Sequence, residues 1–186
     1  VVPVELIVNE NPTANDTTIT EHDCDEDGAA FFDLEAERDN ITGGAADVDV
    51  SFYPTPADAD ADTNEITSNS TNYESAATTI TAVVTNSLTG CESRATVTLN
   101  VIEIENNPQT DEQCAANASN DEAEFDLAGL VADIQGAATE VEVSFHPTAA
   151  DANSNTGAID LSTDYTSSTA TIYARTTAND DEDCYV

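Results

Sequence analysis

The stretch Val48-Asp49-Val50-Ser51-Phe52-Tyr53-Pro54-Thr55 decides the fold class, because it occurs twice. Its counterpart, Val141-Glu142-Val143-Ser144-Phe145-His146-Pro147-Thr148, follows 93 positions later. The alternation of apolar and polar residues before the proline is typical of a half-buried β-strand. Phe32-Asp33-Leu34 recurs with the same spacing at Phe125-Asp126-Leu127, and Cys91 recurs at Cys184. The 186 residues are therefore two copies of a 93-residue unit, and this long period indicates strung or stacked modules.

The two copies differ at their C-terminal ends. Cys91 precedes a strand-like run over residues 92–101, whereas only Tyr185 and Val186 follow Cys184. Tyr185-Val186 joined to residues 1–8 makes a run of the same length that also ends in Leu-x-Val. We therefore expect residues 1–8 to be the final strand of a preceding module, or a donor strand. Residues 9–101 then form the first module, and residues 102–186 form a second module that lacks its last strand. The apolar positions of this inter-module strand are Val1, Val4, Leu6 and Val8.

Short runs rich in Val, Ile, Thr and Phe recur along both copies and are separated by Asn, Asp, Gly, Ser and Pro clusters. The expected strands are 4–8, 29–34, 48–53, 78–85 and 95–101, with counterparts at 124–127, 140–145 and 170–177. Short helical turns are expected at 34–40 and 128–134, and after Pro54 and Pro147. About seven short strands per module predict an all-β chain of two tandem immunoglobulin-like β-sandwich modules arranged end to end.

The four cysteines allow three pairings. Each copy holds one cysteine near its start and one before its last strand, so the repeat symmetry favours one disulfide per module, Cys24 with Cys91 and Cys114 with Cys184. Closing a loop of roughly 70 residues would stabilise each module by about 4 kcal/mol in the chain-entropy model. Disulfides persist in oxidising surroundings, so the cysteines predict an extracellular location. Their wide spacing does not fit a zinc site.

The charge is extreme, with 38 acidic residues against three arginines and no lysine, for a formal net charge of −35. Such a surface repels nucleic acid and anionic lipid, so neither is expected as a partner. No stretch resembles a signal peptide or a membrane span, and no membrane contact is expected from this segment. The sequence contains no nucleophile elbow, phosphate-binding glycine loop or zinc-protease motif, so we expect no enzymatic activity.

One loop in each copy carries oxygen-bearing side chains at alternate positions, a pattern that can converge on a calcium ion. The candidate ligands are Asp58, Asp60, Asp62 and Asn64 in the first copy, and Asp151, Asn153 and Asn155 in the second. The bidentate glutamate of an EF-hand is absent, because Asn69 holds its position. Calcium is the one cofactor that the sequence suggests, and a solvated acidic loop is the alternative.

Several motifs resemble the extracellular repeats of giant cell-surface adhesins in Bacteroidota, including the SprB-type filaments of gliding motility. They are Cys24-Asp25-Glu26-Asp27-Gly28, Phe32-Asp33-Leu34, Val48 to Thr55, Asp58-Ala59, Val84 to Cys91 and Thr96 to Val101. The resemblance covers both copies and departs in the second, where Cys114-Ala115-Ala116-Asn117 replaces the first motif. It implies a structural and adhesive segment of an extracellular, cell-surface filament whose partners are adjacent copies of the same repeat. Asp16-Thr17-Thr18 also resembles the short O-glycosylation motif of secreted Bacteroidota proteins, with Thr17 as the acceptor.

Two other functions fit the same residues. The chain could be a pilus-like subunit that polymerises when residues 1–8 of one copy complete the open module of the next. It could also be a glycan-binding β-sandwich module whose partners are surface glycans. That function requires an exposed aromatic platform, and the chain has only five Phe and five Tyr.

Overall fold

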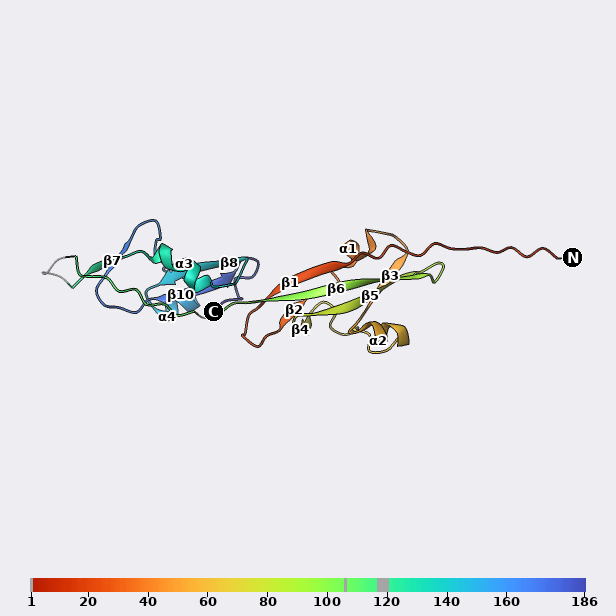
Figure 1. The fold of residues 1–186 in the computed structure, drawn as a ribbon, viewed down its shortest axis with the longest axis horizontal. Coiled ribbons are helices and arrows are strands. Elements are labelled where there is room, and N and C mark those ends of the chain that lie inside the picture. The colour runs from red at the N-terminus through yellow and green to blue at the C-terminus, as the bar shows by residue number, and fades with distance from the viewer. Residues whose placement is uncertain (1, 106, 117–120) are drawn as a thin grey trace. The chain divides into compact units, whose positions relative to one another are not determined.

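A computed structural model describes residues 2–105, 107–116 and 121–186 (Figure 1). The chain is mostly β and divides into two compact units. The first unit comprises the chain up to Glu21 together with Gly28–Val101, and the second comprises His22–Asp27 and Ile102–Val186. Six residues of the first sequence repeat are therefore part of the second unit.

The first unit contains a four-stranded sheet of order β1-β6-β5-β3 and a two-stranded sheet in which β2 pairs with β4. Its elements are β1 (Thr17–Asp23), β2 (Ala30–Phe32), α1 (Arg38–Thr42), β3 (Val48–Tyr53), α2 (Pro56–Ala61), β4 (Tyr73–Ser75), β5 (Thr78–Asn86) and β6 (Glu92–Glu103). The predicted strand at 48–53 is confirmed, and so is the helical turn after Pro54. Residues 4–8, also predicted as a strand, lie in no strand.

Both sheets of the first unit contribute to one apolar core, because alternate residues of their strands face inward. From the larger sheet come Phe52 of β3, Val84 of β5 and Val97 of β6, and from the smaller sheet comes Phe32 of β2. Each of these side chains is at most 1% exposed. The sequence alternation thus identified the inward-facing positions of the strands.

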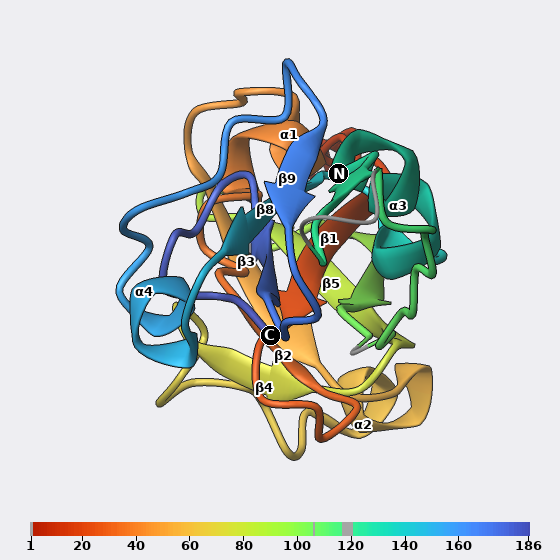
Figure 2. The ribbon, with the colours of Figure 1, turned by 90° about the vertical axis from the view of Figure 1, so that its left-hand side faces the viewer.

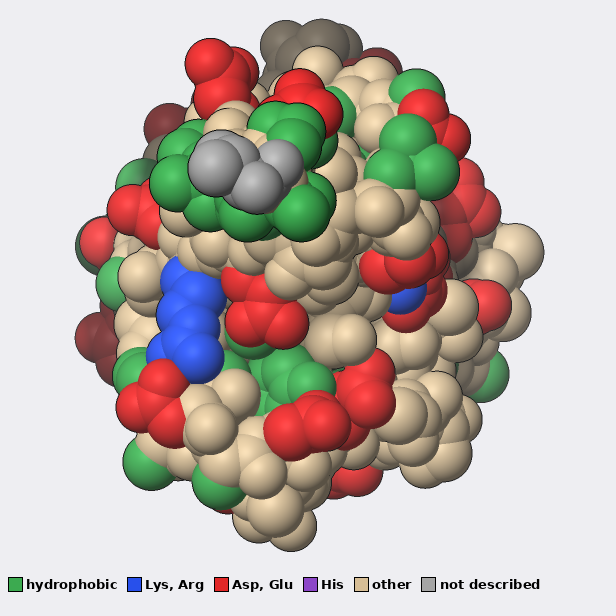
Figure 3. Space-filling model, turned by 90° about the vertical axis from the view of Figure 1, so that its right-hand side faces the viewer, with side chains coloured by type: hydrophobic (Ala, Val, Ile, Leu, Met, Phe, Trp, Pro, Cys, Tyr) green, Lys and Arg blue, Asp and Glu red, His purple; other side chains and the backbone are tan. Residues whose placement is uncertain are grey.

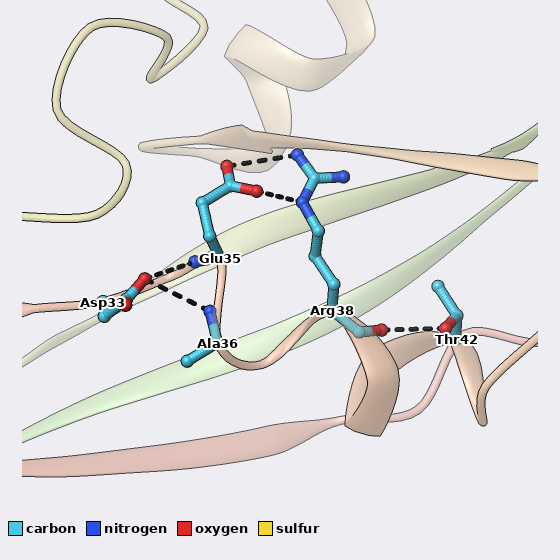
Figure 4. A network of polar contacts seen from close by, with 5 residues as sticks. All are labelled: Asp33, Glu35, Ala36, Arg38 and Thr42. Carbon is cyan, nitrogen blue, oxygen red and sulfur yellow. Dashed lines mark hydrogen bonds and ion pairs between the residues drawn. The ribbon is translucent and has the colours of Figure 1, made fainter.

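The turn between β2 and α1 is held by polar contacts (Figure 4). The Asp33 carboxylate accepts hydrogen bonds from the backbone N–H groups of Glu35 and Ala36, at 3.0 and 3.2 Å. The Glu35 carboxylate pairs with the Arg38 guanidinium, and this hydrogen bond lowers the pKa of Glu35. The same guanidinium lies 5.8 Å from the centre of the Phe52 ring. The Phe-Asp-Leu motif therefore ends β2 and starts the turn that leads to α1.

Strand β1 runs beside β6 in the same direction. The Asp16 carboxylate accepts a hydrogen bond from the Thr96 N–H at 2.7 Å, and the Asn100 amide donates to the Thr20 hydroxyl at 3.5 Å. Both contacts join residues that are 80 positions apart, and a constant offset of this kind is the mark of parallel strands.

The parallel arrangement shows why the predicted Cys24–Cys91 disulfide is wrong. Cys24 follows the end of β1, whereas Cys91 precedes the start of β6. A dozen residues along a strand span about 40 Å, whereas the Cα atoms of a disulfide lie within roughly 7 Å of each other. The two cysteines of the first repeat therefore lie at opposite ends of the same strand pair.

The second unit repeats the pattern of the first with fewer strands. Its elements are β7 (Ala123–Phe125), α3 (Leu127–Gln135), β8 (Val141–His146), α4 (Ala149–Asn153), β9 (Tyr165–Ser167) and β10 (Tyr173–Ala178). β8 pairs with β10, and β7 pairs with β9. In Figure 2, α3 and α4 lie to the right and left of β8. The predicted helical turns at 128–134 and after Pro147 are confirmed.

β10 pairs with β8 as β5 pairs with β3, but its residues lie 92 positions after their β5 counterparts, rather than the 93 positions of the sequence repeat. Val48 pairs with Asn86 in the first unit, whereas Val141 pairs with Ala178 in the second. The hairpin that follows β10 contains one more residue than the hairpin between β5 and β6. This insertion restores the register, since Thr177 bridges Tyr185 as Thr85 pairs with Glu92. Tyr185 and Val186 therefore hold the positions of Glu92 and Ser93 relative to the neighbouring strand.

Candidate functional site

The candidate site is the disulfide between Cys24 and Cys184, which are 160 residues apart in the sequence. Cys24 lies in the His22–Asp27 segment that belongs to the second unit. Cys184 is 1% exposed and packs with Ile104 and Ala178. The bond therefore joins the first sequence repeat to the second, and the predicted Cys114–Cys184 pairing is also wrong.

The remaining two cysteines are free thiols. Cys91 holds the place in the first repeat that Cys184 holds in the second, and its Sγ lies 4.0 Å from the backbone oxygen of Asn9. Cys114 is exposed and holds the place of Cys24. Each repeat therefore presents an equivalent pair of cysteines, and the observed bond uses one from each repeat.

The loop that carries Cys24 is shaped by its own acidic residues. Asp23 is 3% exposed, and its carboxylate accepts hydrogen bonds from the N–H groups of Asp25 and Asp27, each at 3.3 Å. Glu26 and Gly28 have φ angles of 59° and 84°, in the left-handed region that glycine adopts readily. The Cys-Asp-x-Asp-Gly motif is thus a compact turn that presents Cys24 to its partner.

His22 connects the same loop to the rest of the second unit. Its Nε2 lies 3.0 Å from the Thr139 carbonyl oxygen, and its Nδ1 lies 3.4 Å from the Asp180 carboxylate. Both partners are hydrogen-bond acceptors, a backbone carbonyl and a carboxylate. The contact to Asp180 brings the loop to the hairpin that carries Cys184.

Arg175 also contacts the hairpin that carries Cys184. The side chain is on β10, is 4% exposed and faces backbone oxygens rather than a carboxylate. It donates to the carbonyls of Ala152 and Asn153 at 3.1 and 3.3 Å, and to the Glu182 carbonyl at 2.7 Å. Arg175 therefore fixes the end of α4 and the hairpin before Cys184. Sequence reasoning missed this role, although a lone arginine in a strand of so acidic a chain is a visible signal.

Three carboxylates of the Cys24 loop lie close together. The ligand atoms of Asp23, Asp25 and Asp27 lie within 4.8 Å of one another. The negative charge of Asp27 is the main cause that raises the pKa of Asp25. Figure 3 shows acidic side chains spread over one face of the molecule, with few basic ones among them. The chain has only three arginines and no lysine, so little basic charge is available to neutralise this cluster.

The predicted calcium loop of the first repeat has its oxygens directed to protein partners. Asp58 and Asp60 lie in α2, where alternate positions point to different sides of the helix. Asp58 accepts hydrogen bonds from the side chains of Thr55 and Asn64, and these lower its pKa. Asp62 accepts from the Tyr53 hydroxyl at 2.8 Å, and Arg94 pairs with Asp60. The structure does not bring these oxygens together, and calcium binding here stays a prediction.

The corresponding loop of the second repeat has the same helix-capping arrangement. The Thr148 hydroxyl donates to the Asp151 carboxylate at 2.6 Å and accepts from the Asp151 N–H at 3.1 Å. Asn153 ends α4 and uses its backbone oxygen for Arg175, while Asn155 has a φ of 48°. The shared Thr-x-x-Asp spacing therefore starts a helix in both repeats.

The other predicted residues lie apart from the disulfide. The Thr17 hydroxyl, the predicted glycosylation site, donates to the Glu37 carboxylate at 2.9 Å. Val4, Leu6 and Val8 of the predicted inter-module strand are 81%, 89% and 95% exposed, whereas Val1 lies outside the described residues. Within the described part of the chain, no helix has the length and apolar character that a membrane crossing needs.

One comparison with known proteins gives a match that covers both repeats. The family model described as the Flavobacterium inter-domain disulphide bond domain matches residues 16–108 and again residues 110–186. No curated protein and no solved structure matches the chain. Since the two matches cover nearly all of the sequence, the chain belongs to the Flavobacterium inter-domain disulphide bond domain family.

Proposed function

We propose that this chain is a structural segment of an extracellular, cell-surface filament, in which consecutive immunoglobulin-like modules are cross-linked by disulfides. The Cys24–Cys184 bond carries this proposal, because it ties one repeat to the next rather than closing a repeat on itself. The flavobacterial family supports a filament of the adhesin type that the motifs resemble. Stable disulfides require an oxidising location outside the cytosol.

The repeat symmetry extends the bond to further modules. In the observed pair, the last cysteine of one repeat bonds the first cysteine of the repeat before it. By the same rule, Cys91 bonds the first cysteine of a preceding module, and Cys114 bonds the last cysteine of a following module. The two free thiols, Cys91 and Cys114, are then the cysteines that form disulfides with the neighbouring modules of the array.

The acidic surface suits this role. A net charge of −35 keeps separate filaments apart through mutual repulsion. At physiological ionic strength, salt largely screens this repulsion between charges that are more than about 8 Å apart. The function of this segment is to set the length of the filament and to keep its modules joined. Adhesion to surfaces or movement by gliding would be a property of the whole polymer.

Antibody labelling of intact flavobacterial cells that carry this sequence tests the location. We expect labelling at the surface that disappears after external protease treatment, and labelling only after lysis would overturn the proposal. A denaturing, reducing gel of the labelled material then separates two assemblies. A single very large band indicates tandem modules in one chain, whereas a band near 19.5 kDa indicates a polymer of subunits.

A further inference from the structure

We infer that the Cys24 loop (His22–Asp27) docks on the second unit without its disulfide, and that His22 is the residue that positions Cys24 for the bond. The docking surface consists of the Thr139 carbonyl and the hairpin that carries Cys184. The inference goes beyond the proposed function, because it concerns how the junction assembles, wherever the protein is located. The disulfide then locks a contact that the two repeats have already made.

The loop places two polar side chains in buried positions. His22 and Asp23 are 8% and 3% exposed. Burying a polar group is unfavourable unless hydrogen bonds replace those that it makes with water. The partners of Asp23 include the N–H groups of Asp25 and Asp27 within the loop, whereas the partners of His22 lie outside it. Asp23 therefore shapes the loop, and His22 attaches it.

The main acceptor for His22 is held in place by the second unit itself. The His22 Nε2 lies 3.0 Å from the Thr139 carbonyl oxygen. The residues on both sides of Thr139 are hydrogen-bonded, since the Ala138 carbonyl accepts from a side chain at 2.8 Å and the Glu140 carbonyl accepts from the Asn179 N–H at 2.8 Å. The docking surface is therefore present before the loop arrives.

Cys184 is also held by contacts other than the disulfide. Its side chain is 1% exposed and packs with Ile104 and Ala178. Its backbone carbonyl accepts a hydrogen bond from the Ala178 N–H at 2.9 Å, and its N–H donates to the Asp181 carbonyl at 3.1 Å. The position of this sulfur is thus fixed by the packing and hydrogen bonds of the second unit.

The loop also has a place for the reduced Cys24 thiol. The Cys24 Sγ lies 3.4 Å from the His22 carbonyl oxygen, which can accept a hydrogen bond from a thiol. The contacts of the His22 ring with Thr139 and Asp180 involve neither sulfur atom. Both cysteines are therefore positioned by contacts that do not include the S–S bond.

The test measures the effective molarity of the two thiols in a glutathione redox buffer. Cys91→Ser and Cys114→Ser leave Cys24 and Cys184 as the only pair. In this equilibrium the two thiols give two electrons and two protons to glutathione disulfide, which becomes two glutathione thiols. Two thiols joined only by a flexible connection have an effective molarity of about millimolar or less. We expect a value at least roughly a hundredfold higher, as for groups held in position, and a millimolar value would overturn the inference.

Variants of His22 test its role as the positioning residue. His22→Ala should lower the effective molarity at least roughly tenfold, because the docked loop loses its contacts with Thr139 and Asp180. His22→Gln retains an N–H donor and should recover part of this loss. The reduced and oxidised proteins are both folded in this equilibrium, so a general loss of stability in the second unit leaves the ratio unchanged. An unchanged value for His22→Ala, or equal values for the two variants, would contradict the role of His22.

Two matched variants of the hairpin separate this contact from the overall charge. Asp180→Asn removes the carboxylate that His22 contacts, whereas Asp183→Asn removes a charge from another position of the same hairpin. Both variants reduce the repulsion between the acidic loop and the acidic hairpin, so the contact with His22 is the intended difference between them. We expect the lower effective molarity for Asp180→Asn. Equal values, or the reverse order, would count against the contact.

The same samples keep this inference separate from the proposed function. A tryptic map without the Cys24–Cys184 link would overturn both, because the proposed function rests on that bond. A Cys24–Cys184 bond with a low effective molarity would overturn only the docking of the reduced loop.

Discussion

The Arg175 guanidinium carbon lies 3.3 Å from the centre of the Tyr185 ring. Tyr185 follows Cys184, so the cation stacks on the residue next to the disulfide while its N–H groups hold the backbone of the hairpin. A guanidinium over an aromatic face is attracted by the ring quadrupole. One side chain thus organises both sides of Cys184.

Replacing this side chain should destabilise the second unit. Arg175→Leu would remove the hydrogen bonds to the carbonyls of Ala152, Asn153 and Glu182 and the contact with Tyr185, and we expect a loss of about 2–4 kcal/mol in the free energy of unfolding. Urea unfolding measures the loss. Arg94→Ala is the control, because its pair with Asp60 is exposed and such pairs contribute only about 0–1 kcal/mol. Equal effects of the two variants would contradict the role of Arg175.

The disulfide pairing can be read from a tryptic digest. The chain has three arginines and no lysine, so complete cleavage gives peptides 1–38, 39–94, 95–175 and 176–186, each with one cysteine. Without reduction and with free thiols blocked, we expect peptide 1–38 linked to peptide 176–186 and the other two peptides unlinked. Linkage of 1–38 to 39–94 would instead support a disulfide within each repeat.

Removing one charge from the Cys24 loop should stabilise the protein. The pKa of Asp25 is raised in the folded state, mainly by Asp27, so its ionised form opposes folding at neutral pH and this cost disappears as the pH falls. We therefore expect Asp25→Asn to raise the melting temperature at pH 7 in low salt, and less so in 1 M salt, where charges are screened over about 3 Å. Glu74→Gln, at the exposed position of β4, is the comparison. A lower melting temperature for Asp25→Asn would argue that its charge is favourable.

Asp58 should show the opposite dependence on pH. Hydrogen bonds from Thr55 and Asn64 lower its pKa, so its contribution to stability is complete above the ordinary pKa of an aspartate and is lost as the pH falls through the folded value. Carbon-detected NMR titration should show the pKa of Asp58 rising toward its ordinary value in Asn64→Ala. Asp160, whose pKa is lowered by Ser162, is the internal control and should not change.

The local elements were predictable from the sequence. The alternation in Val48–Tyr53 identified β3 to the residue, because a strand with one buried face imposes a period of two. The helices that follow β3 and β8 were predicted after Pro54 and Pro147, and in both the preceding threonine caps the first turn, since capping is a local hydrogen-bonding property.

The site was not predictable in the same way. Nothing in the residues around Cys24 shows that β1 runs parallel to β6, because strand direction depends on contacts 80 residues apart. The assumption that each repeat closes on itself therefore gave the wrong cysteine pairs. The helix at Asp58 and Asp60 was not predictable from their alternate oxygens either, since Thr55 starts a helix there and turns the two side chains to different sides.

The position of the disulfide also affects what a protease can do to the chain. A single cut of the backbone anywhere between residues 24 and 184 leaves two fragments that remain covalently joined, because the disulfide spans the cut. A disulfide within each repeat would leave the peptide bonds between repeats unprotected. If the pairing continues along an array, the spans of successive disulfides overlap, so the polymer stays in one piece after an isolated nick and separates only when its disulfides are reduced.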